Sequence, residues 1–325
     1  MMSMDKKSRR HVLLDWAEQG RIDPGNLERA FAVAGVFPAG QRWLRFLDRL
    51  MLWLGALLIA AGIVFFLAYN WNDLGRYAKF GLVELLVVAA LAVIWRTGID
   101  SIAGKVALLA AALFVGALLA LVGQTYQTGA DTWELFSAWA VLILPWTLLG
   151  RLSALWLLWL GLLNAAVVFY YSIFGGLFGV LFAPDQLMWV LFALNAVALA
   201  AWEGLARGRA SDRWAIRILA TASGGVATAL AIYAIVDFRH EGGWGALAWI
   251  LYLAAAYALY RRLFIDVYVL AGGVLSVIVV VTTWLSMHLF RSAEAGAFLL
   301  IGMLIIGLSA AGGWWLKRIA AEARA

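Results

Sequence analysis

The stretch GKVALLAAALFVGALLALVG at residues 104–123 decides the fold class. From Val106 to Val122 it contains no charged or hydrogen-bonding side chain. A helix of this length, rising about 1.5 Å per residue, crosses the roughly 30 Å hydrocarbon core of a bilayer. Similar apolar runs recur along the rest of the chain. The sequence therefore predicts an all-α polytopic membrane protein.

The composition supports the same class. Of the 325 residues, 65% are hydrophobic and only 14% are charged, whereas a soluble domain is about 45–50% apolar and about 25% charged. This balance excludes an ordinary soluble enzyme, a disordered chain and a nucleic-acid-binding domain. Cysteine is absent, which excludes disulfides and thiolate chemistry.

Two parts of the chain differ in character. Residues 1–46 predict a short cytoplasmic helical hairpin, whose second helix is expected to begin at Asp23 and Pro24 and to end near Ala34. Residues 47–325 predict a membrane domain of about ten helices, with a segment at 175–185 that is either a loop or re-entrant. The predicted spans are 48–70, 77–95, 104–123, 133–150, 152–173, 186–205, 214–236, 244–260, 265–288 and 295–316.

The basic residues predict the orientation. If the N-terminus lies in the cytoplasm, 21 of the 25 Lys and Arg residues fall on the cytoplasmic side of the ten spans. The exceptions are Arg76, Lys79, Arg239 and Arg291. Such an asymmetry is what the positive-inside rule describes. We therefore expect a multi-pass protein of the bacterial inner membrane with both termini in the cytoplasm.

Four polar residues inside the predicted spans are candidate functional residues, because polar groups are costly in hydrocarbon. Glu84 is the only acid well inside a span, and Tyr77 lies about two turns away on the same helix face. This pair predicts either a proton or cation relay or a protonated carboxyl that locks helix packing, and we favour the second. Asn164 and Asn195 either join a cavity or link two helices, and again packing is favoured.

Two predicted outer turns are rich in amides and aromatic rings. Their candidate residues are Asn70, Asn72 and Asp73 in the first turn and Gln124, Tyr126, Gln127 and Asp131 in the second. Neutral hydrogen-bonding groups beside rings suit a sugar-like ligand, a lipid headgroup or an extracytoplasmic partner. Ordinary water-exposed turns are the simpler interpretation. The outer residues Asp237, His240, Glu241, His288 and Glu294 have no metal-binding spacing, so we assign no metal and no cofactor.

Small residues recur at four-residue spacing in two predicted spans. The stripes are Ala112-Gly116-Ala120 and Ala220-Gly224-Thr228. Such stripes allow close approach of helices. The pair Gly272-Gly273 predicts a packing notch or a point where a helix bends, and packing is favoured.

Several segments resemble the bacterial membrane protein family called domain of unknown function 2157. They are LDWAEQGRIDP at 14–24, LGALL at 54–58, LAYNW at 67–71 and GQTYQ at 123–127. The resemblance extends over roughly residues 8 to 150. It implies a bacterial inner-membrane protein and is compatible with a small membrane-anchored extracytoplasmic partner. It supplies no catalytic residues.

Three functions are compatible with these features. The leading hypothesis is a transporter or flippase-like carrier of a small polar or lipid-linked molecule. The second is a non-catalytic scaffold for a membrane or extracytoplasmic partner, with residues 124–131 as the docking surface. The third is a membrane-embedded lipid-modifying enzyme, which needs clustered acids or histidines at one interface. It is less favoured because only the sparse outer group of Asp237, His240, His288 and Glu294 could serve. The bilayer is the expected environment, and no nucleic acid is expected to bind.

Overall fold

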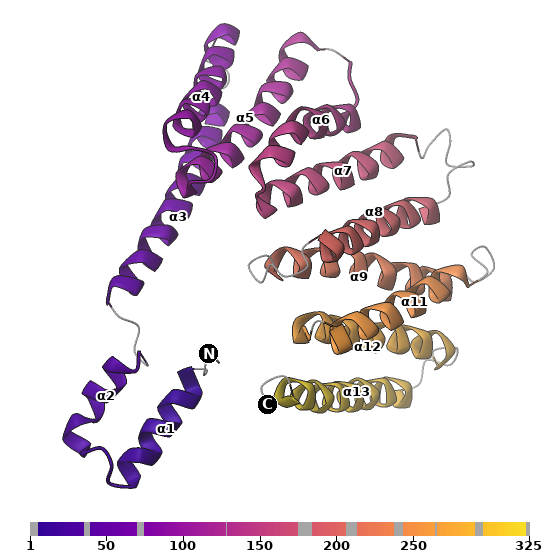
Figure 1. Cartoon of the computed structure of the whole chain (residues 1–325). Coiled ribbons are helices and arrows are strands. Elements are labelled where there is room, and N and C mark those ends of the chain that lie inside the picture. Colours follow the sequence, from indigo (N-terminus) through magenta and orange to yellow (C-terminus); the bar gives the residue numbers. More distant parts are fainter. Residues whose placement is uncertain are drawn as a thin grey trace. The chain divides into compact units, whose positions relative to one another are not determined.

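The computed structural model describes residues 6–35, 40–69, 75–127, 129–174, 184–205, 213–236, 243–263, 265–289 and 295–322. Every element in these ranges is helical (Figure 1). The predicted all-α fold class is therefore confirmed. The predicted re-entrant segment falls almost entirely on residues outside these ranges.

The helices follow one another with short connections. In chain order they are α1 (Lys6–Glu18), the 3₁₀ turn η1 (Pro24–Asn26), α2 (Leu27–Val33), α3 (Gly40–Tyr69), α4 (Arg76–Thr97), α5 (Ile102–Tyr126), α6 (Thr132–Gly150), α7 (Ser153–Phe174), α8 (Pro184–Leu205), α9 (Arg213–Val236), α11 (Trp244–Ala258), the π-helical turn η3 (Leu259–Leu263), α12 (Val267–Leu289) and α13 (Ala295–Glu322).

Eight of the described helices are long and apolar enough to cross a membrane: α4 to α9, α12 and α13. The chain is therefore a multi-pass membrane protein. The other two predicted spans are also helical. They correspond to α3, which has 30 residues, and to α11, which has 15 residues and continues into η3.

The chain divides into two compact units, the first ending at Leu82 and the second starting at Val83, inside α4. In the first unit α1 contacts α2, and Leu13 and Phe31 are buried. Helical structure begins at Pro24, directly after Asp23, as expected, but its first turn is a 3₁₀ turn and not part of an α-helix. The Asn26 amide donates to the Asp23 carbonyl at 2.8 Å, so Asp23 begins a 3₁₀ turn and α2 starts only at Leu27.

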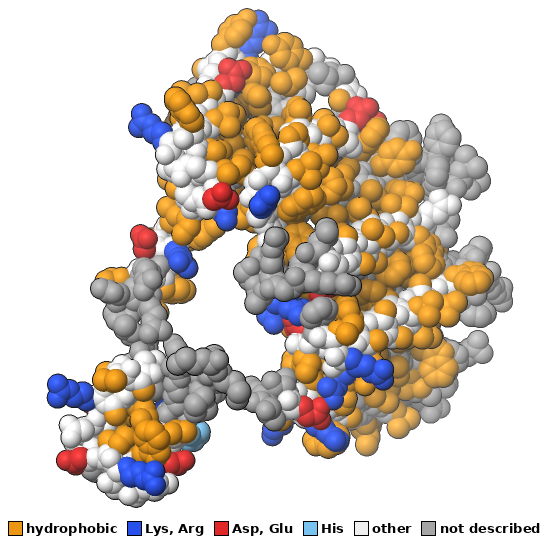
Figure 2. Space-filling view, viewed as in Figure 1, with side chains coloured by type: hydrophobic (Ala, Val, Ile, Leu, Met, Phe, Trp, Pro, Cys, Tyr) orange, Lys and Arg blue, Asp and Glu red, His pale blue; other side chains and the backbone are white. Residues whose placement is uncertain are grey.

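In the second unit α9 is the central helix of the C-terminal half. It packs against α8, α11 and α12, which lie around it in Figure 1. Ile216 and Leu219 of α9 belong to a buried cluster that also includes Leu160 of α7, Tyr260 of η3 and Ile319 of α13. The face shown in Figure 2 is largely hydrophobic over these helices, as contact with lipid requires.

The small-residue stripe of α5, Ala112-Gly116-Ala120, packs against the aromatic ring of Trp139. The Trp139 indole of α6 donates to the Ala112 carbonyl at 2.8 Å. A Cβ on Gly116 would lie 2.3 Å from the same ring. Only a residue without a side chain therefore fits at Gly116.

Candidate functional site

A cavity of about 490 Å³ lies between α9, α11 and α12. This volume falls in the range of about 300–1,000 Å³ that is typical of ligand pockets. Most of its lining residues are Gly, Ala, Leu and Val, and five carry hydroxyl groups: Thr221, Thr228, Tyr252, Tyr268 and Ser276. We call it the α9–α12 pocket. It opens to the surface, because Thr221, Gly225 and Gly272 are exposed.

Glycine residues create much of this space. No heavy atom lies within 4 Å of the position that a Cβ would take on Gly225 or Gly272. At Gly224, by contrast, the Tyr252 hydroxyl would lie 3.4 Å from a Cβ. Gly224 therefore allows α11 to approach α9, whereas Gly225 and Gly272 leave room for a ligand.

A chain of hydrogen bonds joins the three helices at the deep end of the pocket. Trp249 Nε1 of α11 donates to Ser276 Oγ of α12 at 2.7 Å, and Ser276 Oγ lies 2.6 Å from Thr228 Oγ1 of α9. The Thr228 hydroxyl donates to the Gly224 carbonyl at 2.7 Å. Since the Thr228 proton is used there, Ser276 is the donor to Thr228. The three donor groups of this series, on Trp249, Ser276 and Thr228, therefore all have a partner within the protein.

A second polar contact links α11 to α9. The Tyr252 hydroxyl lies 2.9 Å from Ser223 Oγ and donates to the Ala220 carbonyl at 3.2 Å. Ser223 is fully buried and donates to the Leu219 carbonyl at 2.7 Å. Tyr252 is therefore held by α9, and its ring forms one wall of the pocket.

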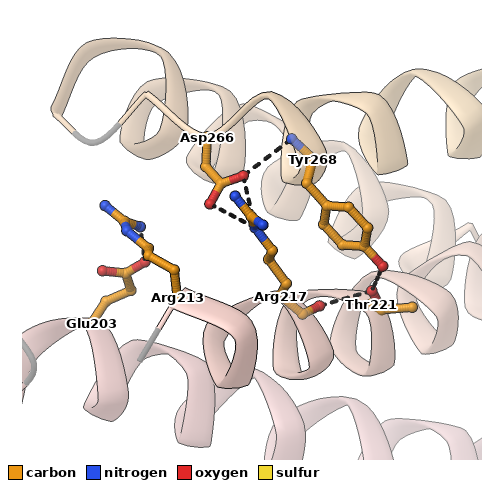
Figure 3. A network of polar contacts seen from close by, with 6 residues as sticks. All are labelled: Glu203, Arg213, Arg217, Thr221, Asp266 and Tyr268. Atoms are coloured by element: carbon orange, nitrogen blue, oxygen red, sulfur yellow. Dashed lines mark hydrogen bonds and ion pairs between the residues drawn. The ribbon is translucent and has the colours of Figure 1, made fainter. Parts of the chain in front are cut away.

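At its other end the pocket meets a charged network (Figure 3). The Tyr268 hydroxyl lies 3.1 Å from Thr221 Oγ1, and the Thr221 hydroxyl donates to the Arg217 carbonyl at 2.8 Å. The Arg217 guanidinium carbon lies 5.6 Å from the centroid of the Tyr268 ring, within the range of a cation–π contact. Arg217 therefore lies beside two lining residues of the pocket.

Asp266 is the buried partner of Arg217. Its side chain is 2% exposed, compared with 46% for Arg217. Arg217 Nε lies 3.3 Å from Oδ1 and 3.2 Å from Oδ2 of Asp266, and the Tyr268 amide donates to Oδ1 at 3.1 Å. Asp266 therefore does two things: it caps the first turn of α12 and neutralises one side of the guanidinium.

A second ion pair joins α8 to α9 one turn earlier. Arg213 Nη1 lies 3.4 Å from Oε1 of Glu203, whose side chain is 8% exposed. Tyr260 is buried in η3, beyond the end of α11.

A third contact at these helix ends joins η3 to α13, because Arg261 pairs with Glu322. The ion pairs thus join the C-terminal end of α8 to the N-terminal end of α9, the N-terminal end of α9 to that of α12, and η3 to the C-terminal end of α13. All the basic residues in these pairs belong to the set that the charge pattern assigned to a single side of the membrane.

Asn164 and Asn195 bind each other across α7 and α8. Asn195 Nδ2 donates to Asn164 Oδ1 at 2.6 Å, and Asn164 Nδ2 donates to Asn195 Oδ1 at 3.3 Å. Each amide also donates at 2.8 Å to the carbonyl four residues earlier, Leu160 or Leu191. This closed arrangement is that of a helix–helix link. Neither residue lines the α9–α12 pocket.

Glu84 and Tyr77 are also outside the pocket. Glu84 is an exposed residue of the second unit. Tyr77 belongs to the first unit, is 76% exposed and accepts a hydrogen bond from Arg76 Nη2 at 3.3 Å. The structure therefore does not bring the predicted intramembrane acid together with the two amides in this pocket.

Some of the candidate outer-turn residues lie in the described ranges. Gln124, Tyr126 and Gln127 are exposed, and Gln127 has a left-handed φ of 44° at the end of α5. Asp131 begins α6 in a capping box, in which its amide donates to Glu134 Oε2 at 3.1 Å. Asp131 thus has a local structural role.

Other candidates fall outside the described ranges. They are Asn70, Asn72, Asp73, Asp237, His240, Glu241 and Glu294, and nothing is described of the His288 side chain either. Among the residues that the structure does describe, no three His, Asp or Glu side chains are placed to hold a metal ion.

The sequence indicated the pocket only indirectly. The stripe Ala220-Gly224-Thr228 and the pair Gly272-Gly273 contribute five of its lining residues. Packing was the favoured interpretation of both features. The importance of Arg217 was missed because a basic residue at a helix end is already explained by the positive-inside rule.

Fold and site together define a helical multi-pass membrane protein with a ligand-sized pocket among its C-terminal helices. Residues 14–156 match the model of a family described as a predicted membrane protein (DUF2157). The resemblance inferred from the sequence is thus confirmed over that range, which is less than half of the chain and ends before the pocket. No curated protein and no solved structure matches the chain.

Proposed function

We propose that this protein is a transporter or flippase-like carrier that binds a lipid-linked molecule in the α9–α12 pocket. One observation supports this proposal above all: an open cavity of about 490 Å³ lies against two helices, α9 and α12, that are long and apolar enough to span a membrane. If α9 and α12 span the bilayer as proposed, the exposed lining residues Gly225 and Gly272 open the pocket to its acyl chains.

The hydrogen bonds of the pocket favour a lipid-linked ligand over a small polar one. Trp249, Ser276 and Thr228 already donate their protons within the protein. A hydrocarbon chain can therefore occupy the pocket without leaving a buried donor unpaired, which would cost about 1–3 kcal/mol. The ligand needs its polar contacts only at the charged end of the pocket.

Pocket-filling variants test this proposal. Gly225→Leu places a side chain in the open space of the pocket, whereas Gly307→Leu adds the same side chain on α13, where space is also free. In proteoliposomes containing fluorescent phospholipid, we expect Gly225→Leu to slow lipid transfer between leaflets and Gly307→Leu to match the unmodified protein. Equal rates in all three proteins would argue against carriage through this pocket.

We further propose that the ion-paired helix ends face the cytoplasm of a bacterial cell, with both termini on that side of the inner membrane. The ion pairs support a common side for Arg213, Arg217 and Arg261. Because the chain has no cysteine, single cysteines at Arg262 and Gln124 can be tested with a membrane-impermeant maleimide on spheroplasts. We expect labelling at Gln124 only, and labelling at Arg262 alone would reverse the orientation.

A scaffold function is the second candidate. It is supported by the exposure of Gln124 and of Tyr126, whose side chain is 62% exposed. A small membrane-anchored extracytoplasmic protein is the proposed partner. Co-purification should then yield a stoichiometric partner that is lost in Gln124→Ala or Tyr126→Ala, and purification of the chain alone would count against this function.

A further inference from the structure

We propose that Arg217 binds the phosphate of an anionic phospholipid whose acyl chain occupies the α9–α12 pocket. This inference rests on the proposed function, because it names the ligand of the same pocket. Three features carry it: the unused hydrogen-bonding capacity of Arg217, the arrangement of residues along α9, and the charge of the neighbouring groups.

The Arg217 guanidinium has two groups, both Nη, that can still donate hydrogen bonds to a ligand. The hydrogen bonds found between its guanidinium and Asp266 come from Nε alone. The side chain is 46% exposed, so the two Nη groups remain accessible. A guanidinium presents several donors in one plane, and this geometry suits phosphate oxygens. The guanidinium carbon lies 5.6 Å from the centroid of the Tyr268 ring, and this ring lines the pocket, so the donors lie beside one end of it.

The residues along α9 suit an amphiphile. Arg217, Thr221, Gly225 and Thr228 follow one another at spacings of three or four residues and share one helix face. The last three line the pocket. From Arg217 to Thr228 the helix rises about 16 Å. A headgroup at Arg217 would thus lie at one end of this face, and the acyl chain would extend over Thr221, Gly225 and Thr228.

The charge balance favours a single anionic group. Asp266 offsets Arg217, and Glu203 offsets Arg213, so the network has no large positive excess. A zwitterionic headgroup would bring its ammonium close to the guanidinium and would be disfavoured. We therefore expect phosphatidylglycerol to bind more tightly than phosphatidylcholine.

The experiment is native mass spectrometry of the full chain in detergent, titrated with phosphatidylglycerol, phosphatidylcholine or glycerol 3-phosphate. Arg217→Gln should lose the preference for phosphatidylglycerol by roughly ten-fold, since a hydrogen bond to a charged group is lost. Asp266→Asn should strengthen the preference, because Arg217 then lacks its counter-charge. Arg262→Gln, which removes an exposed charge in η3, is the matched control and should leave the preference unchanged.

The double variant Arg217→Gln/Asp266→Asn guards against misfolding, because it removes the guanidinium without leaving Asp266 unpaired. It should lose the preference as Arg217→Gln does. An unchanged preference in both variants would overturn the inference. Glycerol 3-phosphate binding as tightly as phosphatidylglycerol would overturn it too, since the site would then recognise a free phosphate and no chain.

Failure of the proposed function gives a different result. If the protein binds phosphatidylglycerol through Arg217 but transfers no lipid between leaflets, this inference stands and carriage fails. If lipid transfer depends on Gly225 but lipid preference does not depend on Arg217, carriage stands and this inference fails.

Discussion

The ion pair between Arg217 and Asp266 predicts an asymmetry between two conservative substitutions. Each removes one charge of the pair, but their surroundings differ: the Asp266 side chain is 2% exposed and that of Arg217 is 46% exposed. Arg217→Gln leaves a buried carboxylate without its cation. Asp266→Asn leaves a guanidinium that can turn toward water.

The magnitudes follow from these environments. Breaking a fully buried pair costs about 3–5 kcal/mol, and the exposure of Arg217 roughly halves this to about 2 kcal/mol. Asp266→Asn keeps an oxygen that can accept from the Tyr268 amide. Since Asn caps a helix about as well as Asp, we expect a loss of only about 0.5 kcal/mol. The double variant should recover most of the loss caused by Arg217→Gln.

The free energy of unfolding can be measured by titration with a denaturing detergent in lipid-free mixed micelles, so that bound lipid does not contribute. The double-mutant cycle then isolates the interaction between the two side chains. If Asp266→Asn destabilises the protein as much as Arg217→Gln does, the assigned burial of the carboxylate is wrong.

Three further comparisons between variants test the packing in the same unfolding assay. Replacing Asn164 or Asn195 by Leu should each cost about 0.6–2 kcal/mol, and the double variant should cost less than the sum; additive losses would contradict the reciprocal pair. Gly116→Ala should destabilise the protein because its Cβ would clash with Trp139. Gly225→Ala should be neutral or stabilising by about 0.5–1 kcal/mol. If Gly225→Ala were the less stable of the two variants, the contact between Gly116 of α5 and Trp139 of α6 would be contradicted. Trp139→Phe should cost about 1 kcal/mol through the lost hydrogen bond to a backbone carbonyl, and an unchanged stability would show that this bond contributes nothing.

The fold class could be predicted from the sequence because hydropathy is a local property. A run such as 104–123 requires a membrane helix whatever its neighbours are. Which helices pack together could not be predicted, because the centrality of α9 depends on contacts with α8, α11 and α12.

The candidate site was harder to predict. Asn164 and Asn195 were recognised by residue type, but their pairing across α7 and α8 appears only in three dimensions. Asp266 lies at the start of a predicted span, where an acidic residue is already accounted for as a helix N-cap. Nothing in the sequence therefore links Asp266 to Arg217, which lies 49 residues earlier. Glu84 was a candidate because it is an acid inside a predicted span. The acids of the described polar network, Glu203 and Asp266, instead lie at the ends of helices.

The most direct test of the central claim is photocrosslinking with a phosphatidylglycerol that carries a diazirine in its acyl chain, followed by peptide mapping. If the α9–α12 pocket holds the chain, crosslinks should concentrate on α9 between Thr221 and Thr228 and on α12 between Gly272 and Val279. The internal comparison is α13, none of whose apolar window is buried in the structure. Labelling of α13 equal to that of the pocket helices would show ordinary lipid contact and would contradict the account.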